Sequence, residues 1–181
     1  SLRISFMCTY PIFLISISYN YIIFIYIYNR FCGKLYSSIL AEFLFPLAKN
    51  HHIRTSLIKT IIKHDQIEFK IDITKDLPEI KCHSQQIQQV IMNLLTNARD
   101  ALNEKHSGYN ENKIIRLNCS HFVKEKRKGI RIIVEDHDNG IPKNIQAKIF
   151  NPFFTTKERD KGTGLGLSIG HGIVKDHNGE L

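Results

Sequence analysis

The sequence predicts an α+β fold in which helices cover one face of a mixed, mostly antiparallel sheet. Apolar and polar residues alternate strictly at 67–73, which is typical of a half-buried strand. Two further β-rich runs, 114–120 and 130–134, are spaced as the antiparallel strands of a hairpin. The segments between these runs have helical spacing, and the regular βαβ alternation of a parallel sheet is absent from the sequence.

The helices of this fold are predicted from apolar periodicity and from residues that begin or end helices. Apolar residues at helical spacing predict a first helix over 39–47. Ser84 is a suitable N-cap for a long amphipathic helix that reaches about Glu104. A proline begins a short helix over 142–149, and a last helix is predicted over 165–176. This order gives one globular domain over 36–181.

The charge of the chain argues against a nucleic-acid partner. Its 181 residues carry a formal net charge of +8, from 25 basic and 17 acidic residues. Residues 1–41 contain Arg3, Arg30 and Lys34 but no acidic residue, so the remaining sequence is only mildly basic. It contains no basic helix and no base-stacking aromatic motif. We therefore expect no binding of nucleic acid.

The cysteines and histidines of the sequence do not predict a zinc site. Cys8, Cys32, Cys82 and Cys119 form no C-x-x-C pair, and the nine histidines are scattered. This usage fits a reducing compartment.

Residues 1–35 differ from the rest and are predicted to lie outside the globular domain. Residues 11–28 carry no charge, are close to the minimum length of a membrane span, and precede Arg30 and Lys34. Polar residues interrupt this stretch, however, and its isoleucines and tyrosines favour strands. Three interpretations stay open: a membrane segment formed by 11–28, a poorly structured and aggregation-prone tail, or sequence that is not a native part of the domain.

The glycine-rich run Gly162–Gly166 is the first candidate binding motif. It has the pattern G-x-G-x-G and precedes an amphipathic run at 168–176. Glycines let the backbone approach a ligand closely, and a glycine turn that opens a helix presents N–H groups suited to phosphate. Taken alone, the pattern is equally compatible with an ordinary turn.

Amide side chains form a stripe on the long predicted helix. Gln85, Gln89, Asn93 and Asn97 follow one another at intervals of four residues and therefore share one face. Two neighbouring asparagine oxygens could bind a hard cation such as Mg²⁺, which takes few protein ligands. The alternative is a polar face that contacts solvent.

Two further segments complete the set of motifs. A β-rich run ends at Asp136, followed by a turn at Gly140; the carboxylate could accept a hydrogen bond from an exocyclic amine, and the glycine leaves room for a flat ring. Residues 149–157 place aromatic side chains around a proline and end at Lys157, which with Lys161 could approach phosphates. Read separately, these are an ordinary turn and a hydrophobic hinge.

The four motifs in this order resemble the catalytic ATP-binding domain of bacterial sensor histidine kinases. That domain belongs to the wider GHKL superfamily of Hsp90, type II topoisomerases and mismatch-repair ATPases. The resemblance covers 38–181 and implies a two-layer α/β sandwich, the Bergerat ATP-binding fold. The matched stretches are 88–101 (N box), 135–142 (G1), 149–157 (F) and 161–168 (G2).

The resemblance implies a role for each matched residue. Asp136 would accept the adenine amino hydrogen bond, Asn97 would be the leading Mg²⁺ ligand with Asn93 beside it, and the catalytic positions would be Asn93 and Gln89. Phe150 and Phe153 would anchor the base of a lid whose glycines close over the phosphates of ATP. The full set of implied nucleotide contacts is Asn93, Asn97, Asp100, Asp136, Gly140, Ile141, Phe150, Phe153, Thr156, Lys157, Gly162, Thr163, Gly164, Leu165, Gly166 and Leu167.

The resemblance also implies partners and a location. The γ-phosphate of Mg-ATP would pass to a histidine on a separate dimerisation domain and from there to a response regulator. The catalytic domain would be cytoplasmic, with a membrane anchor through 11–28 as the open alternative.

The sequence departs from the family pattern in three places. Asp138 stands where G1 usually has glycine, so we expect backbone strain and an added negative charge, with ATP binding weakened or lost. Neither His51-His52 nor His64-Asp65 has the acid and nearby proline of a phosphoacceptor histidine, so no autophosphorylation in cis is expected. The family continues past Leu181 with further strands, so we expect C-terminal strands to be missing, leaving an exposed sheet edge and marginal stability.

Two other functions stay open beside the kinase. One is a catalytically impaired nucleotide-binding remnant or interaction module. The other is an ATPase of the chaperone or mismatch-repair branch, which has a glutamate general base on the amide helix. The candidate positions here hold Gln89 and Asn93, and this favours the kinase.

Overall fold

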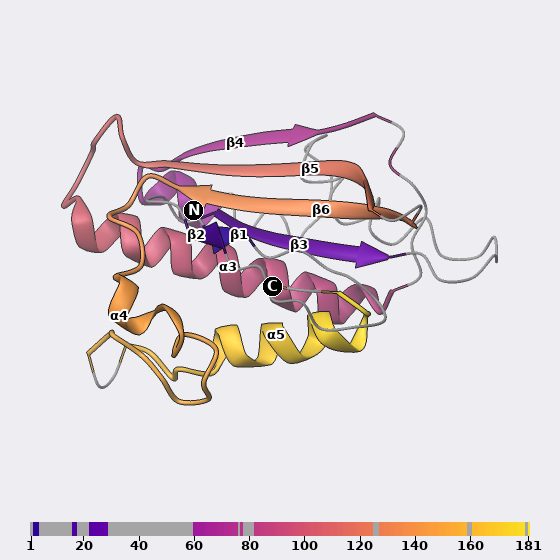
Figure 1. The fold of residues 1–181 in the computed structure, drawn as a ribbon. Coiled ribbons are helices and arrows are strands. Elements are labelled where there is room, and N and C mark those ends of the chain that lie inside the picture. Colours follow the sequence, from indigo (N-terminus) through magenta and orange to yellow (C-terminus); the bar gives the residue numbers. More distant parts are fainter. Residues whose placement is uncertain are drawn as a thin grey trace.

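The computed structural model describes most of the chain from residue 60 onward and three short N-terminal stretches (Figure 1). The described residues are 2–3, 16–17, 22–28, 60–75, 77, 82–124, 127–158, 161–179 and 181. The helix predicted over 39–47 lies outside them.

A four-stranded mixed sheet forms one layer of the molecule. Its order is β3-β6-β5-β4, where β3 is Ile22–Tyr28, β4 is Glu68–Ile73, β5 is Ile114–Lys124 and β6 is Arg127–Asp136. β5 pairs antiparallel with β6 and parallel with β4, and β3 pairs antiparallel with β6. The predicted strand and hairpin are confirmed, and both hairpin strands are longer than expected. A separate two-residue pair joins β1 (Leu2–Arg3) to β2 (Ser16–Ile17).

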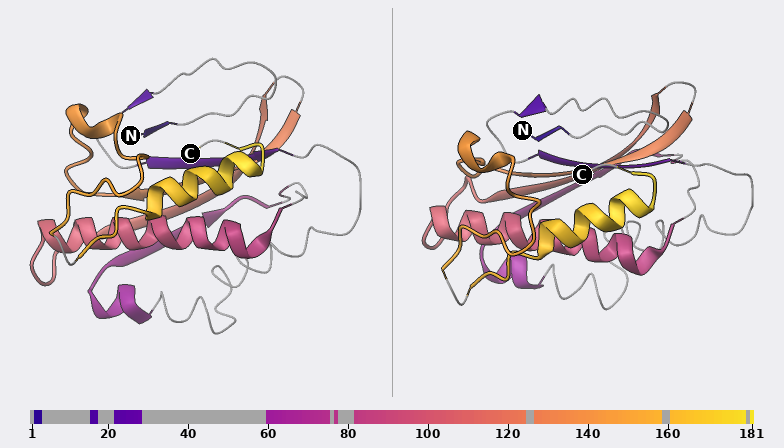
Figure 2. Two further views of the ribbon diagram at one scale, coloured as in Figure 1. Left: turned by 90° about the horizontal axis from the view of Figure 1, so that it is seen from below. Right: turned by 60° about the horizontal axis from the view of Figure 1, so that its bottom comes forward.

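Two helices form the second layer. α3 (Ser84–Lys105) and α5 (Gly166–Asp176) lie side by side on the same face of the sheet (Figures 1 and 2). The short α4 (Lys143–Gln146) lies between β6 and α5 in the chain. The predicted two-layer α+β class, with helices on one face, is confirmed.

The core lies between α3 and the sheet. Ile87, Ile91 and Leu95 of α3 are fully buried in one cluster with Ile115 of β5 and Ile132 of β6. Burying each such side chain contributes about 1.5–3 kcal/mol. This apolar contact fixes the rotation of α3 and leaves its polar face away from the sheet.

The N-cap of α3 is not the residue that the sequence predicts. The N-cap residue is His83, not Ser84, and its side chain makes no cap hydrogen bond. The backbone N–H of His83 instead donates to Nε2 of His177 at 2.9 Å, and His177 Nδ1 lies 2.7 Å from the carbonyl oxygen of Ile173. The start of α3 is thereby tied to the end of α5.

Strand β3 comes from the apolar N-terminal segment. It pairs with β6 from Ile22 opposite Glu135 to Tyr28 opposite Gly129, so β6 is an internal strand of the sheet. Residues 22–28 therefore lie in the same sheet as the strands of the predicted domain 36–181. Within the described ranges, none of the helices combines the length and the apolar character of a membrane span. The rest of the predicted segment 11–28, apart from 16–17, lies outside the description.

Candidate functional site

The amide face of α3 meets the glycine-rich segment at the start of α5. Nδ2 of Asn93 donates to the carbonyl oxygen of Gly166 at 3.1 Å. This bond uses the amide nitrogen of Asn93 and leaves its oxygen free to accept or to bind a cation. Asn97 is half-buried one turn further along the same face, whereas Gln89, one turn earlier, is exposed.

Asp136 ends β6 with a buried carboxylate that is only 2% exposed. Burial raises its pKa to about 7, and the negative charges of Asp138 and Glu135 add to this rise. A hydrogen bond of 3.1 Å from the backbone N–H of Asp138 to Oδ1, together with the positive charge of Lys105, acts in the opposite direction. The other carboxylate oxygen can accept a hydrogen bond from a ligand amine.

Asp138 fits its turn without the expected strain. Among the described residues, the non-glycine residues with positive φ are Gln66, Phe153 and Asn178, so the expectation of strain at Asp138 is wrong. Gly140, with φ of 76°, adopts the left-handed conformation in this turn. Asp138 therefore affects the site through its charge, which raises the pKa of Asp136.

The turn after β6 is fastened to the neighbouring helices. Nζ of Lys105, at the end of α3, donates to the carbonyl oxygen of His137 at 2.9 Å. Nε2 of Gln146 in α4 donates to the carbonyl oxygen of Ile141 at 2.7 Å. These contacts hold the backbone around Gly140 next to Asp136.

The F segment packs against α5 through one of its two predicted anchors. Phe150 is partly buried and stacks on His171 of α5, with ring centroids 5.0 Å apart. The ring of Phe153 is 76% exposed and does not pack in this way. Phe153 meets the glycine segment through its backbone, because a Cβ on Gly164 would lie 2.4 Å from the carbonyl carbon of Phe153.

The glycine segment forms a compact turn before α5. Gly164 has φ of 66°, and a Cβ on Gly162 would lie 2.8 Å from Oγ1 of Thr155. Oγ1 of Thr163 accepts a hydrogen bond from the N–H of Leu165, the N-cap residue of α5, at 3.4 Å. Leu167 is partly buried against the core, and Thr156 is exposed. Side chains at both glycines would disturb this turn.

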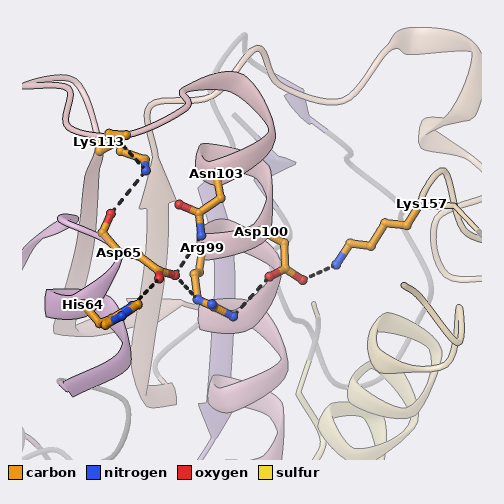
Figure 3. Close-up of polar contacts among 8 residues, drawn as sticks. His64, Asp65, Arg99, Asp100, Asn103, Lys113 and Lys157 are labelled. Atoms are coloured by element: carbon orange, nitrogen blue, oxygen red, sulfur yellow. Dashed lines mark hydrogen bonds and ion pairs between the residues drawn. The ribbon is translucent and has the colours of Figure 1, made fainter. Parts of the chain in front are cut away.

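Lys157 is held on the polar face of α3. Its Nζ lies 2.6 Å from Oδ2 of Asp100, which follows Asn93 and Asn97 on the same helix face (Figure 3). The structure thus brings together Asn93, Gly166, Asp100 and Lys157 from three of the predicted motifs. Asp136 lies at the end of β6, in the turn that Lys105 ties to α3.

A group of residues beyond Asp100 was missed by sequence reasoning. Arg99 lies 3.6 Å from Asp100 through NH1 and also forms a short ion pair with Asp65, which accepts a further hydrogen bond from Asn103 (Figure 3). Asp65 precedes the matched motifs by more than twenty residues, and no spacing rule links it to α3. The His64-Asp65 pair is the one signal in the sequence, and it carries no information about a contact with α3.

The donors near α3 fit Mg²⁺ better than a transition metal. No cluster of three or more His, Cys, Asp or Glu side chains suited to a metal occurs in the part of the chain that is described. The oxygens of Asn93 and Asn97 are hard, neutral donors, as Mg²⁺ prefers when a phosphate supplies most of the charge.

Comparison with known proteins identifies the family. Residues 82–181 match the family described as "Histidine kinase-, DNA gyrase B-, and HSP90-like ATPase". The sensor kinase CckA of Brucella abortus is 41% identical over 119 residues, which are 62% of this chain and 12% of that protein. The sensor histidine kinase ZraS of Escherichia coli K12 is 31% identical over 151 residues, which are 76% of this chain and 30% of that protein. The chain thus spans less than a third of either relative.

Solved structures agree with this assignment. The nucleotide-free catalytic domain of histidine kinase ThkA superposes with a TM-score of 0.55 at 29% identity, covering 77% of this chain and 78% of that chain. Full-length ShkA, solved with AMPPNP, has a TM-score of 0.55 at 22% identity and covers 76% of this chain and 25% of that chain, a likeness of fold. The predicted resemblance to histidine kinase catalytic domains is confirmed.

Proposed function

The chain belongs to the family of histidine kinase-, DNA gyrase B- and HSP90-like ATPases, and on that premise we propose that it binds Mg-ATP and acts as a protein-histidine kinase. The γ-phosphate would pass to a histidine on a separate dimerisation domain and then to a response regulator. The contact that carries the proposal is the Asn93–Gly166 hydrogen bond, because it joins the amide face of α3 to the glycine segment. A cation site and a phosphate site would then be adjacent.

Asp136 supplies the base specificity in this proposal. Its free carboxylate oxygen accepts a hydrogen bond from the exocyclic amine of adenine, and its burial removes the competing water. Guanine carries a carbonyl oxygen at the corresponding position, and two facing acceptors repel. In the proposed complex, Gly140 and Ile141 would lie beside the adenine ring.

The chain's other groups act on the phosphates by position and charge. Mg²⁺, held by the oxygens of Asn97 and Asn93, would neutralise charge on the phosphates. Lys157, whose Nζ is held by Asp100, would present its ammonium group to the phosphates, and the backbone N–H groups around Gly164 and Gly166 would donate to them. The bond from the γ-phosphorus to the bridging oxygen breaks and a bond to the acceptor histidine nitrogen forms, a transfer that depends mainly on positioning and electrostatics.

Gln89 and Asn93 argue against the hydrolytic branch of the family. An amide cannot take a proton from an attacking water, and Gln89 is exposed. Transfer to a histidine nitrogen needs no such base when the acceptor is neutral.

A second function, an impaired nucleotide-binding remnant, is favoured by one observation. The charge of Asp138 raises the pKa of Asp136 and adds repulsion toward an anionic ligand. The Asp138→Gly variant separates the two functions, because it would bind ATP much more tightly than the parent if the parent is impaired.

The test is calorimetric titration with Mg²⁺ and a non-hydrolysable ATP analogue, followed by the corresponding GTP analogue. We expect saturable binding of the ATP analogue, little binding of the GTP analogue, and phosphate transfer from ATP to a supplied dimerisation domain. Absence of ATP-analogue binding in a folded sample would overturn the proposal. If the protein binds the ATP analogue but transfers no phosphate from ATP, the impaired nucleotide-binding remnant describes it better than the kinase.

A further inference from the structure

Asp65 lies outside every matched motif and yet is firmly held beside α3. It follows the helical turn 60–64, whose Ile62 is buried in the core. Its carboxylate accepts hydrogen bonds from Arg99 and, at 2.8 Å, from Nδ2 of Asn103. Its backbone oxygen accepts from Nζ of Lys113, a lysine that is only 3% exposed, at 3.2 Å. The position of Asp65 is therefore fixed by both its backbone and its side chain.

The charges along this row alternate in sign. Asp65 pairs with Arg99, Arg99 reaches Asp100 at 3.6 Å, and Asp100 pairs with Lys157 at 2.6 Å (Figure 3). Figure 3 shows the row crossing α3 from the 60–64 turn to the segment that carries Lys157. Each charge has an opposite charge on at least one side, so the row is stable without a ligand.

Arg99 is the branch point of the row. Its guanidinium carries five N–H donors and can therefore pair with two carboxylates. In the structure its Nε donates to Asp65, and only Nη1 approaches Asp100, at 3.6 Å. Oδ2 of Asp100 is thereby left for Lys157.

We infer that Asp65 is a positioning residue for Lys157: by holding Arg99, it keeps Asp100 available to hold the lysine on the face of α3 that carries Asn93 and Asn97. The ammonium group of Lys157 has three donors, so it can contact Asp100 and a phosphate at the same time. Without Asp65, Arg99 swings onto Asp100 and displaces Lys157 from the polar face of α3. The expected effect on phosphate affinity rests on the proposed function. The placement of Lys157 by Asp65 rests on the ion pairs alone.

The decisive experiment compares Asp65→Asn with the parent by calorimetry, using adenosine and a non-hydrolysable ATP analogue with Mg²⁺. We expect affinity for the ATP analogue to fall roughly threefold to fivefold, near the upper limit for partly exposed ion pairs, and affinity for adenosine to stay within about twofold. In a Lys157→Met background the same substitution should have no further effect. Asp72→Asn, on β4, is the matched control, because its carboxylate contacts Asn118 and lies outside the row.

Equal losses for both ligands, no loss, or a loss that persists in the Lys157→Met background would overturn the inference. A ligand-free measurement keeps it testable if no nucleotide binds. Amine acylation of Lys157, followed by mass spectrometry with exposed Lys143 as the internal reference, should be severalfold faster in Asp65→Asn than in the parent. An unchanged rate would overturn the positioning role, whereas a faster rate without ATP binding would overturn only the proposed function.

Discussion

The two ends of the candidate site are built in opposite ways. At the proposed adenine end, Asp136 is buried near the negative charges of Asp138 and Glu135, and its pKa is raised to about 7. Beside the proposed phosphate end, burial also raises the pKa of Asp65, but hydrogen bonds from Arg99 and other donors outweigh it and lower the pKa to about 2. The Asp136 carboxylate is therefore costly to ionise and has an oxygen available to a ligand. The Asp65 carboxylate has its hydrogen bonds from Arg99 and Asn103 within the protein.

The difference has opposite consequences for stability. The folded pKa of Asp136 lies above its value of 3.8 in the unfolded chain, so its ionisation lowers stability as the pH rises from about 4 to 7. The folded pKa of Asp65 lies below that value, so its contribution is present above pH 3.8 and is lost as the pH falls toward 2. If Asp136 binds adenine as proposed, its burial lowers stability in favour of recognition, whereas the ion pairs of Asp65 stabilise the fold.

The largest expected effect is on binding at the adenine end. Asp136→Asn keeps the shape but replaces the acceptor by an amide whose NH₂ can face the adenine amine. We expect affinity for the ATP analogue to fall roughly tenfold to a hundredfold, the loss from an unpaired buried group, while the free energy of unfolding at pH 8 stays equal or rises. Calorimetry and urea denaturation measure the two quantities. A variant that binds normally, or that is strongly destabilised, would contradict the proposed role.

The next effect is at the base of the lid. Gly164 has positive φ, and a Cβ there would overlap the backbone of Phe153, so Gly164→Ala must distort the turn. We expect affinity for the ATP analogue to fall about tenfold, from roughly 1–2 kcal/mol of backbone strain, with adenosine affinity little changed. Gly172→Ala is the matched control, because its Cβ would meet no atom within 4 Å and should stabilise α5 by up to about 1 kcal/mol.

A smaller effect is expected on stability at the phosphate end. Asp65→Ala should lower the free energy of unfolding by roughly 1–2 kcal/mol at pH 7, because Arg99 and Asn103 lose a shared acceptor. Urea denaturation at several pH values measures this difference, which should narrow as the pH falls below 4. A difference that is the same at pH 3 and pH 7 would show that the charge of Asp65 is not responsible.

The smallest effect concerns the pH dependence of binding. Because the ionised form of Asp136 is the stronger acceptor, affinity for the ATP analogue should rise a few-fold between about pH 6 and pH 8. Asp138→Gly removes a negative neighbour and should move this rise to lower pH. Calorimetric titrations of the ATP analogue between about pH 6 and pH 8 measure this shift. An identical pH profile of affinity in the parent and in Asp138→Gly would exclude an influence of Asp138 on Asp136.

The sequence predicts the motif-bearing parts of this molecule well, because each depends on local pattern. The four-residue spacing of the amide side chains correctly predicted that Asn93 and Asn97 share one face of α3. The alternation of apolar and polar residues predicted a strand at 67–73, one residue longer than β4. The charge row was not predictable, because it joins Asp65 to Arg99 across elements distant in sequence. The expectation of backbone strain at Asp138 was wrong, because the left-handed residue of this turn is Gly140.

The apolar N-terminus illustrates the same limit. Its β-forming composition was visible in the sequence, but the partner of β3 was not. The pairing with β6 depends on a strand edge more than one hundred residues away, opposite Glu135 and Val134. Local composition cannot specify such a partner.

The most direct test of the account titrates adenosine and the Mg²⁺-bound ATP analogue into the parent, Asp136→Ala and Lys157→Met. If the two ends have the assigned roles, Asp136→Ala weakens both ligands by a similar factor, and Lys157→Met weakens only the ATP analogue. Adenosine binding that is unaffected by Asp136→Ala, or equally weakened by Lys157→Met, would contradict the division of the site into an adenine end and a phosphate end.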